Sequence, residues 1–290
     1  MDISWKERED KRVPINRIIP FSAVDGLGNR TAIFVQGCNI DCKYCHNPET
    51  RAICCNCGAC VPTCPTGALL FDEQMQVVFD RTKCVECDTC IRICKHDASP
   101  RVTWMSAVEV YEEVRKQVPF IRGVTVSGGE CSLYPDFLQE LFTLCKKDGL
   151  STLLDSNGMI AYAQLRQVLE VTDGVMLDIK AFGEEAAISV IGEHNHVVLE
   201  NAKYLAIAGK LEEIRTVVVP ELFDARTVIF AIGDLLSRYT DLAKLRYKLI
   251  TYRKYGVREA YQGLQEPTED DMKQLEAYAR AQGFEGVVII

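Results

Sequence analysis

Long apolar runs and dense basic stretches are both missing from this chain of 290 residues. No segment approaches the roughly 18 consecutive apolar residues that a membrane-spanning helix needs. Residues 1–12 are crowded with charge, whereas a signal peptide has an apolar core behind a basic end. The net charge is −8, and no basic patch offers an electrostatic footprint for nucleic acid. We therefore expect a cytoplasmic protein that binds neither a membrane nor a nucleic acid.

Cysteine is absent after Cys145, yet the chain holds 14 cysteines. Because no export signal is recognised, a reducing compartment is expected, and metal ligation explains this number better than disulfides do. Eleven of the cysteines form a triplet and two runs of four, whereas Cys55, Cys131 and Cys145 are left over. The last two are expected to be buried apolar positions.

Each run of four has the spacing CxxCxxCxxxC, which is typical of bacterial ferredoxins with two clusters. In those proteins the fourth cysteine of each run ligates the other run's cluster. A pair of zinc sites is the alternative, but four thiols within eleven residues, twice, exceed what tetrahedral zinc needs. The spacing to the next cysteine favours Cys54 over its neighbour Cys55 as a ligand. The prediction is two 4Fe-4S clusters, one held by Cys54, Cys57, Cys60 and Cys94 and the other by Cys84, Cys87, Cys90 and Cys64.

The triplet Cys38, Cys42 and Cys45 has the spacing CxxxCxxC and offers three thiolates. A cubane 4Fe-4S cluster has four irons, so one iron stays open to a ligand from outside the protein. S-adenosylmethionine can chelate that iron, and one electron from the cluster then releases a 5′-deoxyadenosyl radical. A Cys₃His zinc site with His46 is the alternative, but adjacent Cys45 and His46 would have difficulty turning toward one metal. The triplet is therefore the predicted catalytic centre.

Six motifs in order resemble those of the activating enzymes of glycyl radical enzymes, within the radical S-adenosylmethionine superfamily. The resemblance covers nearly all of the chain after Ile15. A two-cluster insert after the triplet is typical of most of this family outside the pyruvate formate-lyase activase, and the whole pattern resembles the YjjW-type branch most closely. The motifs are VDGLGNR (24–30), GCNIDCKYCHNPE (37–49), SGGE (127–130), LLDSNG (153–158), VMLDIK (175–180) and IRTVVVP (214–220).

The resemblance implies a binding site for S-adenosylmethionine at the carboxyl ends of several strands. The loop 128–130 would hold the amino group, Tyr44 would meet the adenine, and two basic residues would supply positive charge. Taken alone, the glycines could equally form an ordinary turn. The implied cofactor-binding residues are Tyr44, Gly128, Gly129, Glu130, Asp155, Ser156, Asp178, Lys180 and Arg215.

Two acidic residues at adjacent strand ends would repel each other, so a cation between them is physically reasonable. The resemblance implies a monovalent cation that also touches the S-adenosylmethionine carboxylate. Surface carboxylates at strand ends are the alternative. The implied cation ligands are Asp155, Ser156, Met176 and Asp178.

Two positions depart from the family pattern. Leu27 stands where the family has proline, and the neighbouring Asp25, which would face the partner's glycine loop, is retained. Near the carboxyl end the chain has Tyr252 and Arg253 where the best-characterised activase has a Tyr-His pair. The role of that histidine is therefore not transferred to Arg253.

Apolar periodicity predicts an α/β fold with a parallel sheet, because strands alternate with helical stretches. The resemblance further implies a partial (β/α)6 barrel, interrupted by a ferredoxin-like insert. The expected division is a charged tail at 1–14, the barrel at 15–50 and 102–290, and the insert at 51–101. Strands are predicted at 31–35, 123–127, 151–155, 174–179, 213–219 and 247–251, and helices at 106–118, 136–147, 162–170 and 268–282.

The expected activity is abstraction of a hydrogen atom from a backbone glycine of a partner glycyl radical enzyme. Three 4Fe-4S clusters, S-adenosylmethionine and a monovalent cation would be the cofactors, and a flavodoxin or ferredoxin would donate electrons to a monomeric enzyme. The insert clusters would carry those electrons or help to dock the partner. Two alternatives stay open at this point: a radical enzyme acting on a small molecule or peptide, and a ferredoxin-like electron-transfer protein.

Overall fold

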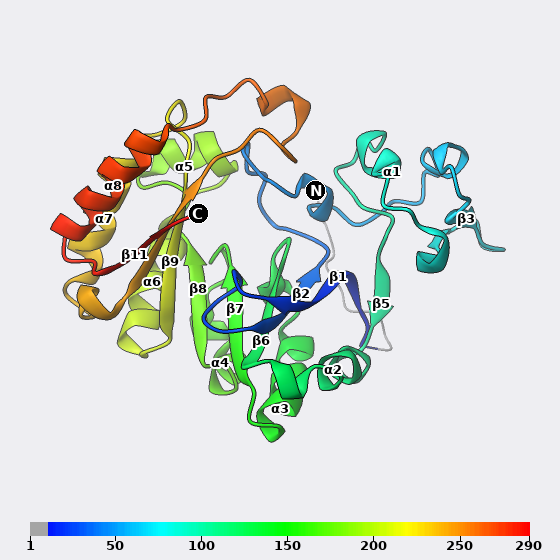
Figure 1. Ribbon diagram of the computed structural model, residues 1–290, viewed down its shortest axis with the longest axis horizontal. Helices are drawn as coiled ribbons and strands as arrows, with labels where there is room; N and C mark the ends of the chain where they lie inside the picture. Colours follow the sequence, from blue (N-terminus) through cyan, green and yellow to red (C-terminus); the bar gives the residue numbers. More distant parts are fainter. Residues whose placement is uncertain (1–10) are drawn as a thin grey trace.

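The computed structural model describes residues 11–290 (Figure 1). Residues 1–10 of the expected charged tail lie outside this range. The first strand begins at Val13, two residues before the expected start of the barrel, because Val13 and Pro14 pair with Met105 and Trp104. In residues 11–290 no helix is both long and apolar enough to span a bilayer.

One curved sheet of nine strands organises the described chain, in the order β11-β10-β9-β8-β7-β6-β2-β1-β5. Every pair from β2 to β11 is parallel, whereas β1 is antiparallel to both of its neighbours. The end strands do not pair with each other, so the barrel is partly open. The strands are β1 (Val13–Ser22), β2 (Arg30–Val35), β5 (Thr103–Met105), β6 (Gly123–Gly128), β7 (Ser151–Ser156), β8 (Gly174–Asp178), β9 (Leu211–Val218), β10 (Arg246–Thr251) and β11 (Gly286–Ile289).

The α/β prediction is confirmed, and the six strands predicted from the sequence are β2 and β6 to β10. The pattern did not predict β1, β5 or β11. β1 contains Pro14 and Pro20, which obscure a strand pattern, and β5 has only three residues. β11 adds a parallel strand beyond the six that the resemblance implies.

Helices cover the outer side of the curved sheet (Figure 1). Ser106, at the start of the helix predicted over 106–118, caps α2 through a reciprocal capping box with Glu109. The predicted helix at 162–170 is instead a 3-10 turn (Tyr162–Gln164) followed by the short α4. The helices of this layer are α2 (Ala107–Arg115), α3 (Pro135–Lys147), α4 (Arg166–Glu170), α5 (Glu184–Ile191), α6 (His196–Ile207), α7 (Ala225–Leu236) and α8 (Glu269–Ala281).

Strand alternation separates two environments. Val124 and Val126 of β6 pack into the main apolar core with residues such as Leu138 of α3. Arg215 on β9 and Lys248 on β10 are register partners on the opposite, polar side of the sheet. The inside of the barrel is therefore charged and able to bind polar groups.

The turn between β1 and β2 reaches across this polar interior. Lys248 donates to the Val24 carbonyl oxygen at 3.1 Å, and Thr125 donates to the Asp25 carbonyl oxygen at 2.6 Å. Arg30, almost fully buried, donates to Thr125 at 2.8 Å and to the Val124 carbonyl oxygen at 2.6 Å. These bonds hold the VDGLGNR segment against the barrel strands.

Residues 52–98 form a smaller lobe at the side of the barrel, on the right of Figure 1. A bridge between Ala52 and Ala98 joins the two ends of this lobe. Its small core contains Cys60, Leu69 and Cys90. The elements of the lobe are β3 (Leu69–Phe71), β4 (Val77–Phe79), which pairs antiparallel with β3, and α1 (Thr89–Arg92).

Candidate active site

The triplet Cys38, Cys42 and Cys45 lies in the loop that follows β2. Gly37 donates its backbone N–H to the Thr50 carbonyl oxygen at 2.7 Å, and Lys43 donates to the Val190 carbonyl oxygen at 3.0 Å. The loop is thus anchored to the start of the small lobe and to α5.

The three thiols of the triplet are close enough to influence one another. Burial, with a smaller contribution from the neighbouring thiolates, raises the pKa of Cys38 and of Cys42 to about 12. Lys180 acts in the opposite direction on all three pKa values. Three soft sulfur ligands beside one cation suit an anionic 4Fe-4S cluster with an open iron.

Gly128 and Gly129 let the end of β6 pack on the backbone that leads into the triplet. Gly129 donates to the Val35 carbonyl oxygen at 3.0 Å, and Glu130 donates to the Gly37 carbonyl oxygen at 2.7 Å. A Cβ at Gly129 would lie 2.1 Å from the Gly37 oxygen, and Gly128 has a φ of +121°. A side chain at Gly129 would therefore displace the triplet loop, and one at Gly128 would collide with the backbone of Val35 at the end of β2.

Glu130 is 1% exposed, and its carboxylate accepts several hydrogen bonds from the protein. Ser132 donates its hydroxyl at 2.6 Å and its N–H at 2.9 Å, the Ser156 hydroxyl donates at 2.8 Å, and the Asn157 N–H donates at 2.7 Å. Burial raises the pKa of Glu130, whereas these bonds lower it. The side chain therefore joins the end of β6 to the end of β7.

Asn157 was not singled out from the sequence, although it belongs to the LLDSNG motif. Its amide nitrogen lies 3.7 Å from the Cys38 sulfur and donates to the Asn39 side-chain oxygen at 2.8 Å. Its backbone N–H is one of the donors to Glu130. The only available signal was its position directly after a strand end.

Asp155, Met176 and Arg215 meet inside the barrel. Arg215 contacts the Asp155 carboxylate at 2.8 Å, the Glu213 carboxylate at 2.6 Å and the Met176 sulfur at 2.9 Å. The Ser127 hydroxyl also donates to Asp155 at 2.8 Å. Burial raises the pKa of Asp155, while Arg215 lowers it. The pKa of Arg215 is raised by its acidic neighbours, which outweigh burial, so its guanidinium stays charged at neutral pH.

Asp178 and Lys180 form a second pair, 2.7 Å apart, at the end of β8. Asp178 also raises the pKa of Asp155, so the two carboxylates interact. The Ser156 hydroxyl is separated from this group: Ser156 pairs with Leu177, which faces the helices, and the hydroxyl donates to Glu130. Of the four implied cation ligands, the structure therefore brings together the side chains of Asp155, Met176 and Asp178.

Tyr44 and Asp25 contact different parts of the chain. Tyr44 is buried with Ile40 and Val217, and its hydroxyl donates to the Lys180 carbonyl oxygen at 3.4 Å. Asp25 accepts a hydrogen bond from the Ser22 hydroxyl at 2.5 Å and influences the Asp155 carboxylate electrostatically.

Comparison with known proteins decides the family. The Radical SAM superfamily profile matches residues 32–231. A Haemophilus influenzae protein assigned the name glycyl-radical enzyme activating enzyme is 33% identical over 300 residues, covering 96% of this chain and 97% of that protein. The chain belongs to the glycyl radical enzyme activating enzymes of the radical SAM superfamily. Its activity is the generation of a glycyl radical on a partner protein, as the sequence resemblance implied.

Other relatives agree with this assignment. The Escherichia coli pyruvate formate-lyase 1-activating enzyme is 31% identical over 255 residues, covering 83% of this chain and 82% of that enzyme. The structure of Streptococcus suis SuiB bound to the precursor peptide SuiA matches with a TM-score of 0.56 and 13% identity, over 88% of this chain and 47% of SuiB. The SuiB match bears on the fold alone.

In the small lobe of the activating enzyme, the four cysteines expected to hold one cluster line a single pocket, with Leu69 and Phe79 among the other lining residues. They are Cys64, Cys84, Cys87 and Cys90. In the other predicted ligand set, the Cys54 thiol is influenced electrostatically by Cys57 and Cys94.

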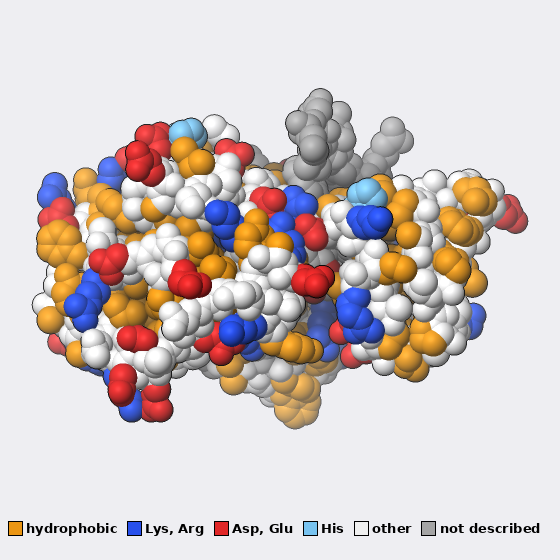
Figure 2. Space-filling view, turned by 90° about the horizontal axis from the view of Figure 1, so that it is seen from above, with side chains coloured by type: hydrophobic (Ala, Val, Ile, Leu, Met, Phe, Trp, Pro, Cys, Tyr) orange, Lys and Arg blue, Asp and Glu red, His pale blue; other side chains and the backbone are white. Residues whose placement is uncertain are grey.

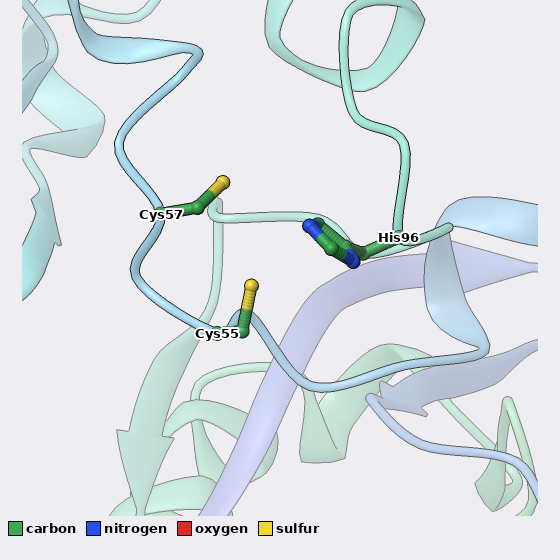
Figure 3. Close-up of side chains that lie close together, drawn as sticks. All are labelled: Cys55, Cys57 and His96. Atoms are coloured by element: carbon green, nitrogen blue, oxygen red, sulfur yellow. The ribbon is translucent and has the colours of Figure 1, made fainter.

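Cys55 has surroundings of its own. The ligand atoms of Cys55, Cys57 and His96 all lie within 4.8 Å of one another, and all three side chains are exposed (Figure 3). Soft sulfur and imidazole atoms at this spacing could bind a metal. Since Cys57 is also an expected cluster ligand, Cys55 is a competitor of Cys54 for the same position.

The position that departs from the family pattern lies against the triplet loop. Arg253 donates its backbone N–H to the His46 ring nitrogen Nε2 at 3.4 Å, and the His46 ring stacks on Tyr252 with 5.9 Å between centroids. Burial and Arg253 lower the pKa of His46 to about 4. His46 is therefore a neutral acceptor here, and the Arg253 side chain is exposed.

Proposed function

We propose that this activating enzyme carries three 4Fe-4S clusters, and that the one on Cys38, Cys42 and Cys45 binds S-adenosylmethionine. The observation that carries the proposal is the gathering of three buried or half-buried thiols beside Lys180, in a loop on which Gly128 and Gly129 pack. With these cofactors bound, one electron from the cluster would cleave S-adenosylmethionine into methionine and a 5′-deoxyadenosyl radical. That radical would take a hydrogen atom from the partner's glycine and leave as 5′-deoxyadenosine.

The protein's own residues then bind and orient the cofactor. The backbone of the loop 128–130 would receive the amino group, and the hydrogen bonds to Glu130 keep that loop in shape. Lys180 and Arg215 would face the carboxylate, and Tyr44 would lie beside the adenine. Asn157 would also take part, because its side-chain amide donates toward the sulfur of Cys38.

A monovalent cation would share the carboxylates of Asp155 and Asp178 with Arg215 and Lys180. Both carboxylates already have a basic partner within 2.8 Å. The cation would therefore have to loosen at least one of these ion pairs. Ser156 could contribute only its backbone oxygen, because its hydroxyl donates to Glu130.

The small lobe would hold the other two clusters, in the manner of the YjjW-type branch. The shared pocket of Cys64, Cys84, Cys87 and Cys90 supports the crossed ligand sets that the ferredoxin spacing predicts. Cys57 and Cys87 are exposed, which suits electron transfer from a flavodoxin or ferredoxin. We expect the enzyme to act as a monomer on its partner.

Replacing Cys54 with serine should remove one insert cluster, whereas Cys55→Ser should leave all three in place. Cys54 lies near Cys57 and Cys94, whereas Cys55 is exposed and fails the ferredoxin spacing. Iron analysis of the reconstituted proteins measures the difference, which is about a third of the total iron. The reverse result, with iron lost only in Cys55→Ser, would assign Cys55 as the ligand.

The decisive experiment for the proposed function is anaerobic. The reconstituted enzyme is mixed with dithionite, S-adenosylmethionine and a glycyl radical enzyme encoded in the same genome, and the electron paramagnetic resonance spectrum is recorded. A carbon-centred doublet that requires S-adenosylmethionine is expected. Deoxyadenosine without the doublet would reject that partner, and neither product from a protein with all three clusters would contradict the proposed site.

A further inference from the structure

A cleft of about 1400 Å³ lies between the barrel and the small lobe. Small-molecule sites are usually about 300–1,000 Å³, so this cleft is larger than a cofactor needs. In Figure 2 acidic and basic side chains gather where the lobe, on the right, meets the rest of the molecule. None of the residues proposed to bind S-adenosylmethionine lines this cleft. Residues 46–50, which directly follow Cys45, do line it.

Three parts of the chain form the walls of the cleft. The barrel contributes β1 and the inner side of β2, including Arg17 and Phe34. The small lobe contributes Arg92 beside Ile91, and the segment after β10 contributes Tyr255, which is 83% exposed. The walls thus combine apolar surface with charges of both signs. This mixture suits an extended peptide segment better than a polyanion or a lipid.

The cleft leads from the small lobe toward the barrel interior. Cys84 and Cys94, both expected cluster ligands, line it on the lobe side. Asp25 also lines it, and Asp25 interacts electrostatically with Asp155 inside the barrel. A segment lying in this cleft would therefore touch the lobe while its tip approached the proposed cofactor site.

Half-buried ion pairs hold the walls together. Arg258, from the segment after β10, contacts Asp41 at 2.7 Å and Asp97 at 3.4 Å, and donates to the Cys42 carbonyl oxygen at 2.8 Å. Arg51 contacts Asp97 at 2.9 Å. Because these pairs connect the lobe, the triplet loop and the carboxyl-terminal segment, the cleft has a defined width.

We propose that the glycine-bearing segment of the partner enzyme lies in this cleft, so that the small lobe forms one wall of the protein-substrate site. This inference rests on the proposed function, since it presupposes a glycyl radical enzyme as the substrate. It assigns the lobe a part in substrate binding, in addition to any role in electron transfer. A protein electron donor is the competing occupant, and the test distinguishes the two.

The test compares two charge reversals in one segment of the lobe. Arg92 lines the cleft, whereas Lys95 is also exposed but lies outside the lining. Glycyl radical formation is measured against partner concentration with dithionite as the only reductant, at matched iron content. Arg92→Glu should raise the half-saturating partner concentration about tenfold, with a smaller effect on the yield at saturation, and Lys95→Glu should match the wild type.

A direct measurement keeps the inference falsifiable if Arg92→Glu loses iron. The photocrosslinking residue benzoylphenylalanine, placed at position 92, should attach to the partner peptide that contains the target glycine; at position 95 it should not. Equal half-saturating concentrations for both charge reversals, or crosslinks from position 92 only to other surfaces, would overturn the inference. A defect seen only with a flavodoxin as donor would also overturn it, in favour of an electron-donor site. Absence of any glycyl radical with the wild type would instead contradict the proposed function.

Discussion

Replacing Cys42 with alanine should abolish S-adenosylmethionine cleavage while the small lobe keeps its iron. Cys42 is 7% exposed and lies with Cys38 and Cys45 in a loop that the lobe's own cysteines do not enter. Without it only two thiols remain, too few to hold a cubane cluster with one open iron. Deoxyadenosine, measured by chromatography after dithionite reduction, should be undetectable, and the iron content should fall by about a third.

Cys145→Ala is the matched control for this variant. Cys145 is buried in α3 among apolar neighbours and belongs to none of the proposed cluster sites. The control should retain both cleavage and iron. Cleavage that persists in Cys42→Ala would refute the assignment of the triplet as the catalytic centre.

Replacing Arg215 with methionine should reduce the free energy of unfolding by about 3–5 kcal/mol, because removing one member of a buried ion pair leaves the other charge uncompensated. Arg215 is 7% exposed, and its guanidinium lies between Asp155 and the fully buried Glu213. Urea denaturation of the iron-loaded protein under anaerobic conditions would measure the loss.

Arg246→Met provides the comparison. Arg246 contacts the same Glu213 carboxylate at 3.2 Å but is 23% exposed, and Glu213 would keep Arg215 and Lys248 as partners. A loss of about 1 kcal/mol or less is expected. If the two variants were equally stable, the buried charges inside the barrel would contribute little to folding, and their arrangement would have to be explained by cofactor binding alone.

Local patterns predicted the regular part of the fold well. The strands β2 and β6 to β10 are short segments rich in apolar residues that alternate with helical stretches along the chain. The helix predicted over 268–282 is α8, which begins after a capping box at Thr268 and ends at Ala281. β1 was not, because its pairing with β2 and β5 is a long-range contact that overrides its two prolines.

Within the site, the sequence was informative where function depends on the spacing of residues along the chain. It was less informative where function depends on the direction in which a side chain points. Asp155 and Ser156 are adjacent in the motif, yet strand alternation sends their side chains to opposite faces. Glu130 was expected at the cofactor, but the sequence did not show that its carboxylate joins two strand ends. A motif gives the order of the residues but does not state which hydrogen bonds their side chains make.

Cysteines a few residues apart lie close together in any fold, so local spacing was enough to predict the clusters. Apolar periodicity was enough to predict the α/β repeat, and the resemblance of six short motifs indicated the family. Only the tertiary structure decided which charges neutralise one another and what borders the catalytic loop. Arg258 and Cys42 are 216 positions apart, and Lys248 and Val24 are 224 apart. Contacts over such separations depend on how the sheet curves and where the small lobe packs, and no local pattern encodes them.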